Sequence, residues 1–227
     1  MLQKSLSKFI ELLFENSCLI CRKSSKESLV CNKCENEFTL RKNNYIKQLN
    51  GIKVFSWGLY DGRLRAGIIS LKASQKKLAC YFAKKLAGFW KQTGENKNYK
   101  DFLVIPIPSH QKRIKERGYC QVSLIAEEFA KITGLQYANN FVKRTKETSY
   151  MNSLKNITER QENIKGAFEI NAELPHEKIL IIDDIVTSGS TILELARTIK
   201  NKYPQAEITG LTVASGDTYD LIATIGP

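Results

Sequence analysis

The sequence predicts an α/β protein: a doubly wound, mostly parallel β-sheet with a small N-terminal module built on four cysteines. Short runs that are apolar on both faces alternate with amphipathic helical patterns, which is typical of a parallel sheet covered by helices. Two Cys-x-x-Cys pairs stand close together near the N-terminus. At 227 residues the chain can form one main domain and one small appendage.

Composition indicates a folded chain. The sequence is 42% hydrophobic and 26% charged, which excludes disordered, collagen-like and coiled-coil proteins. No apolar run approaches the ~20 residues of a membrane-spanning helix, so no stable membrane insertion is expected. Residues 1–14 are interpreted as an amphipathic packing helix, because Glu11 interrupts the apolar residues and no small-residue cleavage site follows. A cytoplasmic protein is expected.

The N-terminal cysteines predict a structural zinc site. Each Cys-x-x-Cys turn directs two thiolates at one ion, and two turns complete a tetrahedral shell with bonds of about 2.3 Å. Disulfides and an iron centre are the alternatives, and the absence of a secretion signal favours reduced thiols. The expected ligands are Cys18, Cys21, Cys31 and Cys34. The module is expected to span residues 1–42, followed by the main domain over 43–227.

In the first part of the main domain, a strand pattern gives way to helical patterns. Alternating side chains end in the turn Asp61-Gly62, which indicates a strand. Apolar residues at helical spacing follow, and in the second helix they lie opposite a row of lysines. These patterns predict a strand over 52–60, helices over 63–71 and 75–91, and an exposed row of Lys77, Lys84 and Lys91.

From residue 101 onward, strand, loop and helix alternate. Short continuous apolar runs predict buried strands, and Gly134 is placed to end a helix in the left-handed conformation. The predicted order is a strand over 102–105, a basic loop over 106–118, a helix over 122–132, a strand over 141–144, a polar stretch over 145–165, a strand over 179–182, a helix over 193–199 and a strand over 206–214.

Residues 179–191 carry the chemistry. A buried strand ends in Asp183 and Asp184, and the loop Thr187-Ser188-Gly189-Ser190-Thr191 then begins a helix. Ligands of α/β proteins bind outside the carboxyl ends of strands, and N–H groups at a helix start can hold a phosphate together with hydroxyls. Gly189 allows the backbone to approach closely. The carboxylates are suited to sugar hydroxyls, directly or through Mg²⁺ and water.

Several other site classes are not supported. The loop lacks the Lys of a nucleoside-triphosphatase loop and the spaced glycines of a dinucleotide-binding loop. A receiver domain would need a third Asp at another strand end, and a zinc deaminase would need Glu two residues after His110 or His176. A capped turn with a solvated Asp pair is the remaining structural alternative.

The same segment resembles the signature of type I phosphoribosyltransferases, and residues 18–214 are similar to the ComF/GntX family. That family carries an N-terminal four-Cys zinc knuckle on a phosphoribosyltransferase fold. The motifs that carry the resemblance are Tyr60-Asp61-Gly62, Leu71-Lys72, Ile105-Pro106-Ile107-Pro108, Arg117-Gly118-Tyr119, Arg144-Thr145, Glu159-Arg160-Gln161-Glu162-Asn163 and Gly166-Ala167-Phe168.

The resemblance implies a ligand and residue roles. Asp183 and Asp184 would face the ribose hydroxyls of phosphoribosyl pyrophosphate, bound with Mg²⁺, and the loop from Thr187 to Thr191 would hold its 5-phosphate. Lys72 falls at the family's pyrophosphate loop. Arg113 and Arg117 would close over the diphosphate. The implied activity is phosphoribosyl transfer to an unidentified nitrogen acceptor, in a protein linked to DNA uptake and natural transformation.

The charge distribution supports an anionic partner and leaves other functions open. Between Asp61 and Cys120 there are fourteen Lys or Arg against four Asp or Glu, a net +10 of the total +12. Two alternative functions are open: a regulator that binds phosphoribosyl pyrophosphate without catalysis, and a non-catalytic competence factor that binds single-stranded DNA and contacts DNA-uptake proteins. Tyr81, Trp90 and Tyr99 are candidates for base stacking, and packing in the core is the competing interpretation of these rings.

Overall fold

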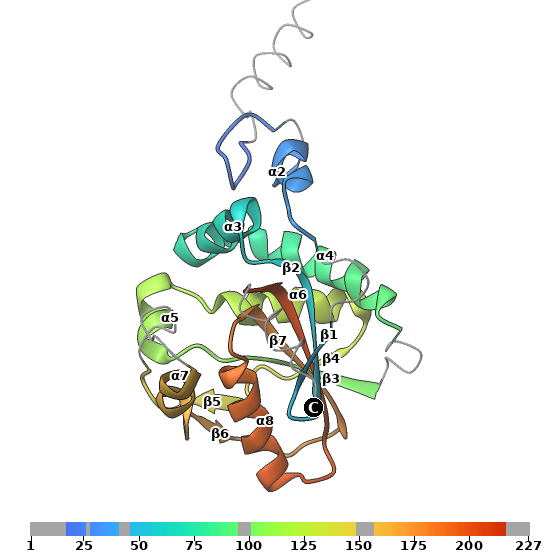
Figure 1. The fold of residues 1–227 in the computed structure, drawn as a ribbon, viewed down its shortest axis with the longest axis vertical. Coiled ribbons are helices and arrows are strands. Elements are labelled where there is room, and N and C mark those ends of the chain that lie inside the picture. The colour runs from blue at the N-terminus through green and yellow to red at the C-terminus, as the bar shows by residue number, and fades with distance from the viewer. Residues whose placement is uncertain (1–16, 26–27, 41–45, 95–100, 149–156, 217–227) are drawn as a thin grey trace, which may run out of the picture.

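A six-stranded sheet forms the centre of the molecule (Figure 1). The computed structural model describes residues 17–25, 28–40, 46–94, 101–148 and 157–216. The strand order is β1-β2-β8-β7-β3-β4, in which only β1 and β2 are antiparallel neighbours. The strands are β1 (Ile46–Leu49), β2 (Ile52–Leu59), β3 (Phe102–Pro106), β4 (Gln136–Tyr137), β7 (Lys178–Val186) and β8 (Glu207–Ser215). The predicted doubly wound, mostly parallel sheet is confirmed.

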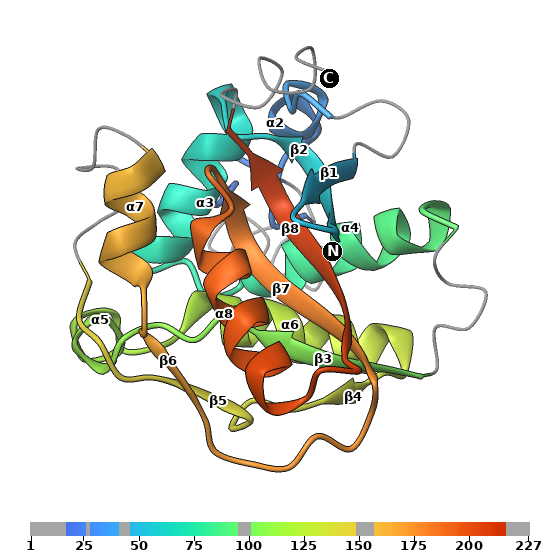
Figure 2. The same cartoon turned by 60° about the horizontal axis from the view of Figure 1, so that its bottom comes forward.

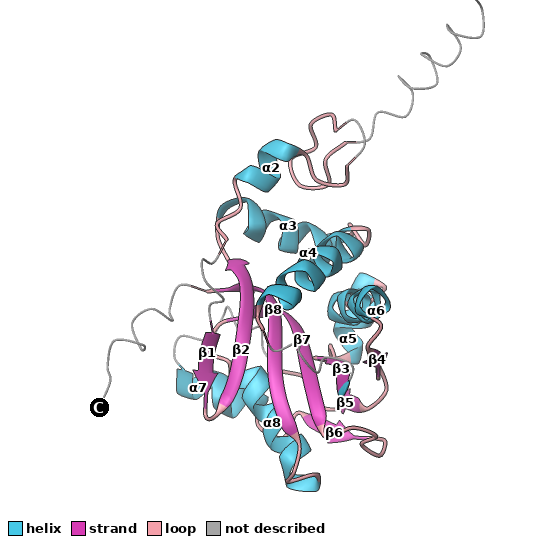
Figure 3. Ribbon diagram, turned by 90° about the vertical axis from the view of Figure 1, so that its right-hand side faces the viewer, coloured by secondary structure: helices cyan, strands magenta, loops and turns pink. Residues whose placement is uncertain are grey.

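Helices cover both faces of this sheet (Figures 2 and 3). Helices α3 (Gly62–Ala73), α4 (Leu78–Gln92) and α6 (Gln121–Thr133) lie on one face, and α8 (Ser190–Lys202) lies on the other. Burial on both faces explains why the central strands are continuous apolar runs rather than alternating ones. In β7, for example, all four residues from Ile179 to Ile182 are fully buried.

The basic segment predicted as a loop contains a helix, α5 (Gln111–Arg117), so that part of the prediction is wrong. His110 caps its first turn, because its Nδ1 accepts the backbone N–H of Lys112 at 3.3 Å. Gly118 ends the helix with a φ of +78°, a conformation that glycine adopts without steric cost. The polar stretch that follows also ends in a helix, α7 (Ile157–Ile164).

Two short strands form a separate antiparallel sheet beside α8. They are β5 (Val142–Arg144) and β6 (Phe168–Ile170). The strand expected over 141–144 is therefore present, but it pairs outside the central sheet. The sequence did not predict β1, β4 or β6, because strands of two to four residues carry too little periodic pattern to be recognised.

The cysteine module, which includes helix α2 (Asn32–Asn36), packs on the outer side of α3 and α4 (Figures 1 and 3). The Phe38 ring meets the Trp57 ring edge to face at 5.8 Å. A Cβ added to Gly67 of α3 would lie 3.0 Å from Cδ1 of Ile20, so glycine allows the module to approach closely. The predicted helix over 1–14 and the boundary between residues 42 and 43 lie outside the described residues, and both stay predictions.

Within the described part of the chain, no helix is long and apolar enough to cross a membrane.

Candidate functional site

A pocket of about 330 Å³ lies where three parallel strands end. Its walls include Tyr60 after β2, Pro108 after β3 and Thr187 after β7. Because parallel strands present their carboxyl ends at the same edge of a sheet, these three loops face one another across the pocket. The volume falls within the range of small-molecule binding sites.

The pocket collects the ligand-binding residues predicted from the main domain. They come from the end of α3, from α5, from the end of β7 and from the first turn of α8. The predicted residues that line it are Lys72, Arg113, Arg117, Asp183, Asp184, Thr187, Ser188, Gly189, Ser190 and Thr191.

The two acids of β7 have different surroundings. Asp184 Oδ2 forms an ion pair with Lys72 Nζ at 3.1 Å and accepts a hydrogen bond from Gln121 Nε2 at 3.0 Å. Asp183 Oδ1 accepts the backbone N–H of Asp184 at 2.8 Å. Burial raises the pKa of the Asp183 carboxyl, and the neighbouring Asp184 charge adds to the shift. The pair therefore lies in a low-dielectric site, where a hydrogen bond donated to a carboxylate oxygen is stronger than it would be in water.

The hydroxyl-rich loop forms the N-terminal end of α8. Gly189 is the N-cap residue with a φ of +73°, and the Oγ atoms of Ser188 and Ser190 lie 2.7 Å apart. A Cβ added at position 189 would come within 2.3 Å of Cδ1 of Leu49 from strand β1. Glycine is required here by both the backbone conformation and the close strand. The N–H groups of the first turn and the dipole of a 13-residue helix make this end suitable for a phosphate.

Helix α5 explains how two predicted arginines reach one pocket. Arg113 and Arg117 are four residues apart on a helix and so share a face. Arg117 Nη1 donates to Gln121 Oε1 at 2.9 Å, while Arg113 Nη2 donates to the Thr148 carbonyl at 3.0 Å. The two guanidinium groups are therefore held from different sides.

The sequence analysis assigned no role in the site to two further pocket residues, Gln121 and Arg144, although Arg144 belongs to one of the motifs that carry the family resemblance. Gln121 is buried and connects Arg117 to Asp184, and only its position one turn after Arg117 could have suggested this. Arg144 of β5 lines the pocket with only 8% of its surface exposed. Its burial depends on the pairing of β5 with β6, and the sequence predicted the strand at β5 but not its partner.

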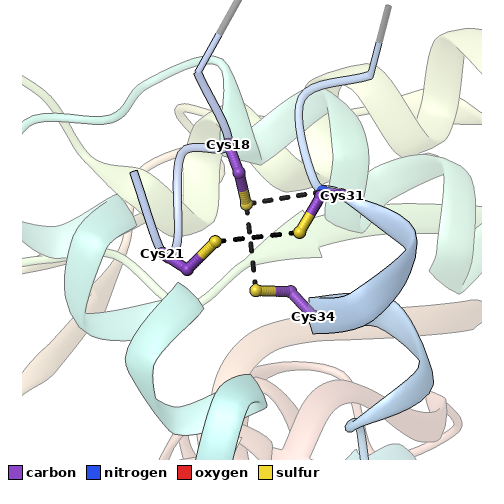
Figure 4. Close-up of side chains that lie close together, drawn as sticks. All are labelled: Cys18, Cys21, Cys31 and Cys34. Atoms are coloured by element: carbon purple, nitrogen blue, oxygen red, sulfur yellow. Dashed lines mark hydrogen bonds between the residues drawn. The ribbon is translucent and has the colours of Figure 1, made fainter. Parts of the chain in front are cut away.

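The four N-terminal cysteines form one cluster (Figure 4). All four sulfurs lie within 4.8 Å of one another, and the closest separations are 3.7 Å for Cys21–Cys31 and 3.9 Å for Cys18–Cys34. Bonds of about 2.3 Å to a tetrahedral ion place the ligand sulfurs about 3.8 Å apart. A disulfide needs about 2.05 Å. The donor set therefore fits a zinc ion and does not fit disulfide pairing.

Two of the three aromatic residues proposed to stack on DNA bases pack against other rings of the protein. Trp90 is 1% exposed, and its ring meets Phe55 and Phe102 edge to face. Tyr81 is half-buried and makes edge contacts with the rings of Phe38 and Phe82. The competing interpretation, packing in the core, is confirmed for Trp90. The third candidate, at position 99, lies outside the described residues.

Comparison with known proteins gives a consistent family pattern. A family model described as "Phosphoribosyl transferase domain" matches residues 81–222, more than half of the chain. Competence protein F of Haemophilus influenzae is 31% identical over 100 residues, which are 43% of this chain and 43% of that protein. Competence protein ComFC of Streptococcus pneumoniae is 35% identical over 98 residues, 43% of this chain and 41% of that protein.

DNA utilization protein YhgH of Escherichia coli strain K12 is 30% identical over 94 residues, 41% of each chain. The matched segments thus cover less than half of each of these relatives.

Proposed function

Because the chain belongs to the phosphoribosyltransferase domain family, as a ComF-like member, we propose that its pocket binds phosphoribosyl pyrophosphate together with Mg²⁺. The observation that carries the proposal is the convergence of one acidic pair, one hydroxyl-rich helix start and five cationic residues in one pocket, Lys72, Arg113 and Arg117 among them. These groups match the ribose hydroxyls, the 5-phosphate and the diphosphate of that ligand.

Each part of the pocket has a role in binding. The helix start at Gly189 and its hydroxyls hold the 5-phosphate. Asp183 and Asp184 accept hydrogen bonds from the ribose hydroxyls, and their oxygens also suit Mg²⁺, which proteins hold through one or two carboxylates plus substrate phosphates. Lys72 and Arg117, which lie close to Asp184, contact the diphosphate. Arg113 closes over the diphosphate from the α5 side.

We further propose that the protein transfers the phosphoribosyl group to a nitrogen acceptor. The nitrogen lone pair forms a bond to the anomeric carbon as the bond from that carbon to the diphosphate oxygen breaks. Pyrophosphate leaves with the electron pair, and the acceptor's proton passes to solvent or to the leaving group. Lys72, Arg113 and Arg117 stabilise the growing negative charge on the leaving diphosphate. Bound Mg²⁺ supplies further neutralisation of the diphosphate.

Calorimetric titration of phosphoribosyl pyrophosphate with Mg²⁺ tests the ligand. We expect wild type to bind, and the double variant Asp183→Asn, Asp184→Asn to bind at least about 100-fold more weakly, because two charge-assisted hydrogen-bond acceptors are lost. Glu173→Gln, an exposed carboxyl outside the pocket, is the matched control and should bind as wild type does. If wild type gives no heat of binding and no thermal shift with this ligand, the proposed ligand is refuted.

A second candidate function is binding of single-stranded DNA. Lys77, Lys84 and Lys91 are all exposed at seven-residue spacing along α4, and relatives are named competence and DNA utilization proteins. Since Trp90 is buried, this surface would contact phosphates rather than stack on bases. Such binding is independent of sequence and weakens steeply with salt.

Changing Lys77, Lys84 and Lys91 to Glu tests the second candidate. We expect weaker binding to a single-stranded oligonucleotide, and the slope of log affinity against log salt should fall by about 0.7 for each phosphate that is no longer neutralised. Fluorescence anisotropy over a salt series measures both quantities. A charge-matched control changes Lys143, Lys200 and Lys202, which are exposed on β5 and α8. Equal affinity of the α4 variant and wild type would remove this function.

A further inference from the structure

Four cations of the pocket fall into two groups that different residues hold together, while a fifth, Arg65, lies over the Tyr60 ring. In the first group Lys72 and Gln121 both contact Asp184, and Arg117 joins through Gln121. This group is a continuous network that contains one of the two acids. It places a lysine and an arginine near one carboxylate, next to the site proposed for the diphosphate.

The second group lies on the side of the small β5–β6 sheet. Arg144 Nη2 donates to the hydroxyl of Thr148, and Arg113 Nη2 donates to the carbonyl of the same residue. Thr148 is 6% exposed, so this anchor is itself buried. The two arginines thus donate to the same neutral residue, Thr148.

Arg144 is a buried cation that forms no ion pair with any carboxylate of the described residues. It is 8% exposed, and its Nε is buried without a hydrogen-bond partner. The Phe168 ring, 5.8 Å from Cζ, is its main apolar neighbour.

The surroundings of Arg144 leave it charged at an energetic cost. Burial lowers the pKa of its guanidinium to about 10, and the charge of Arg113 contributes. Asp183 opposes this shift, but the pKa of that carboxyl is itself raised by burial. Arg144 remains protonated at neutral pH, so the pocket that it lines contains a buried positive charge. An anion bound beside this charge would offset the cost of its burial.

The proposed ligand has only two anionic groups, and both are already matched. The helix start at Gly189 takes the 5-phosphate, and the network of Lys72 and Arg117 takes the diphosphate. Resting on the proposed function, we propose that Arg144 binds a carboxylate of the nitrogen acceptor, so that the acceptor is an anionic molecule rather than a neutral base. A guanidinium suits this role because it recognises a carboxylate through two parallel hydrogen bonds.

The first stage of the test separates the acceptor from phosphoribosyl pyrophosphate. The ligand and Mg²⁺ are titrated into wild type, Arg144→Gln and Lys143→Gln. Lys143 neighbours Arg144 on β5, but its side chain is exposed and does not line the pocket, so the control removes the same charge. We expect the three dissociation constants to agree within about threefold.

The outcomes of this stage are distinguishable. Loss of affinity by tenfold or more in Arg144→Gln alone would place this residue on the diphosphate and overturn the inference, while the proposed function stands. Absence of binding to wild type would instead refute the proposed function.

The second stage presents acceptor-like probes to the ligand-saturated protein. Three pairs differ in carrying a carboxylate or not: orotate and uracil, nicotinate and nicotinamide, anthranilate and aniline. Apparent affinities come from thermal shifts over a concentration series. We expect at least one carboxylate to bind wild type and Lys143→Gln at least about tenfold more tightly than its neutral partner. This advantage should disappear in Arg144→Gln. If no carboxylate is preferred in any pair, the inference is wrong.

Discussion

Replacing Cys34 with Ser is expected to abolish zinc binding and to lower the free energy of unfolding by about 4 kcal/mol or more. Cys34 is 1% exposed and is one of the four clustered cysteines, so its loss opens the tetrahedral shell. Elemental analysis of the purified protein measures the zinc, which should fall from about one per chain to near zero. Urea denaturation measures the stability.

The large expected loss of stability follows from the packing of the cysteine module against the main domain. The cluster residues have little core of their own, so a zinc ion held by the four sulfurs would maintain their fold and thereby their packing against the main domain. Two ion pairs connect the module to the main domain. Glu35–Lys85 joins it to α4, and Glu37–Arg63 joins it to α3. Opening the cluster releases these interactions together.

A cysteine outside the cluster supplies the control. Cys80 of α4 is half-buried and is not one of the four clustered residues, so Cys80→Ser should retain zinc and lose no more than about 1 kcal/mol. Wild type that contains near-zero metal and four titratable thiols would contradict the zinc assignment. Unchanged stability of the Cys34 variant would contradict the structural role.

Gly189→Ala is expected to destabilise the protein by about 3 kcal/mol and to weaken ligand binding at least about tenfold. One part of the cost is the φ of +73°, which a residue with a Cβ rarely adopts. The other part is the collision with the Leu49 side chain, 2.3 Å from the added carbon. Relief of this collision would move the loop proposed to hold the 5-phosphate. Urea denaturation and ligand titration measure the two effects.

Two further variants separate the two parts of that cost. Adding Leu49→Ala to Gly189→Ala removes the collision but not the backbone strain. The double variant should therefore bind the ligand more tightly than Gly189→Ala does, and this gain should exceed any change in affinity that Leu49→Ala causes by itself. Gly134→Ala is the matched control, since Gly134 has a φ of +74° with no atom within 4 Å of an added Cβ. It should cost only about 1 kcal/mol and leave the ligand affinity unchanged. Equal stability losses for the variants at positions 189 and 134 would contradict the role of Leu49.

Features that are formed by residues adjacent in the chain could be predicted from the amino-acid sequence. The strand ending in Asp183 and Asp184, the loop at Gly189 and the start of α8 are contiguous, so their residue types indicate both the local fold and the chemistry. The two Cys-x-x-Cys turns are local in the same way. Apolar runs on both faces predicted a parallel sheet, because strands buried by helices on both sides show that pattern.

Helix α5 marks the limit of this local prediction. Its sequence is almost wholly polar and none of its residues is buried, so no apolar face indicated a helix. The one local indication of the helix was Gly118, since glycine often ends a helix in the left-handed conformation. The helix matters because it places Arg113 and Arg117 on one face.

Which side chains meet across long separations depends on the tertiary structure. Gln121 reaches Asp184 across 63 residues, and Leu49 closes on Gly189 from a strand too short to predict. The same holds for burial: Trp90 belongs to the core rather than to a DNA surface, and Arg144 is a buried cation of the pocket. Sequence pattern shows which residues can lie on one face of an element. It does not show what that face packs against, and packing sets the burial and charge environment on which the site depends.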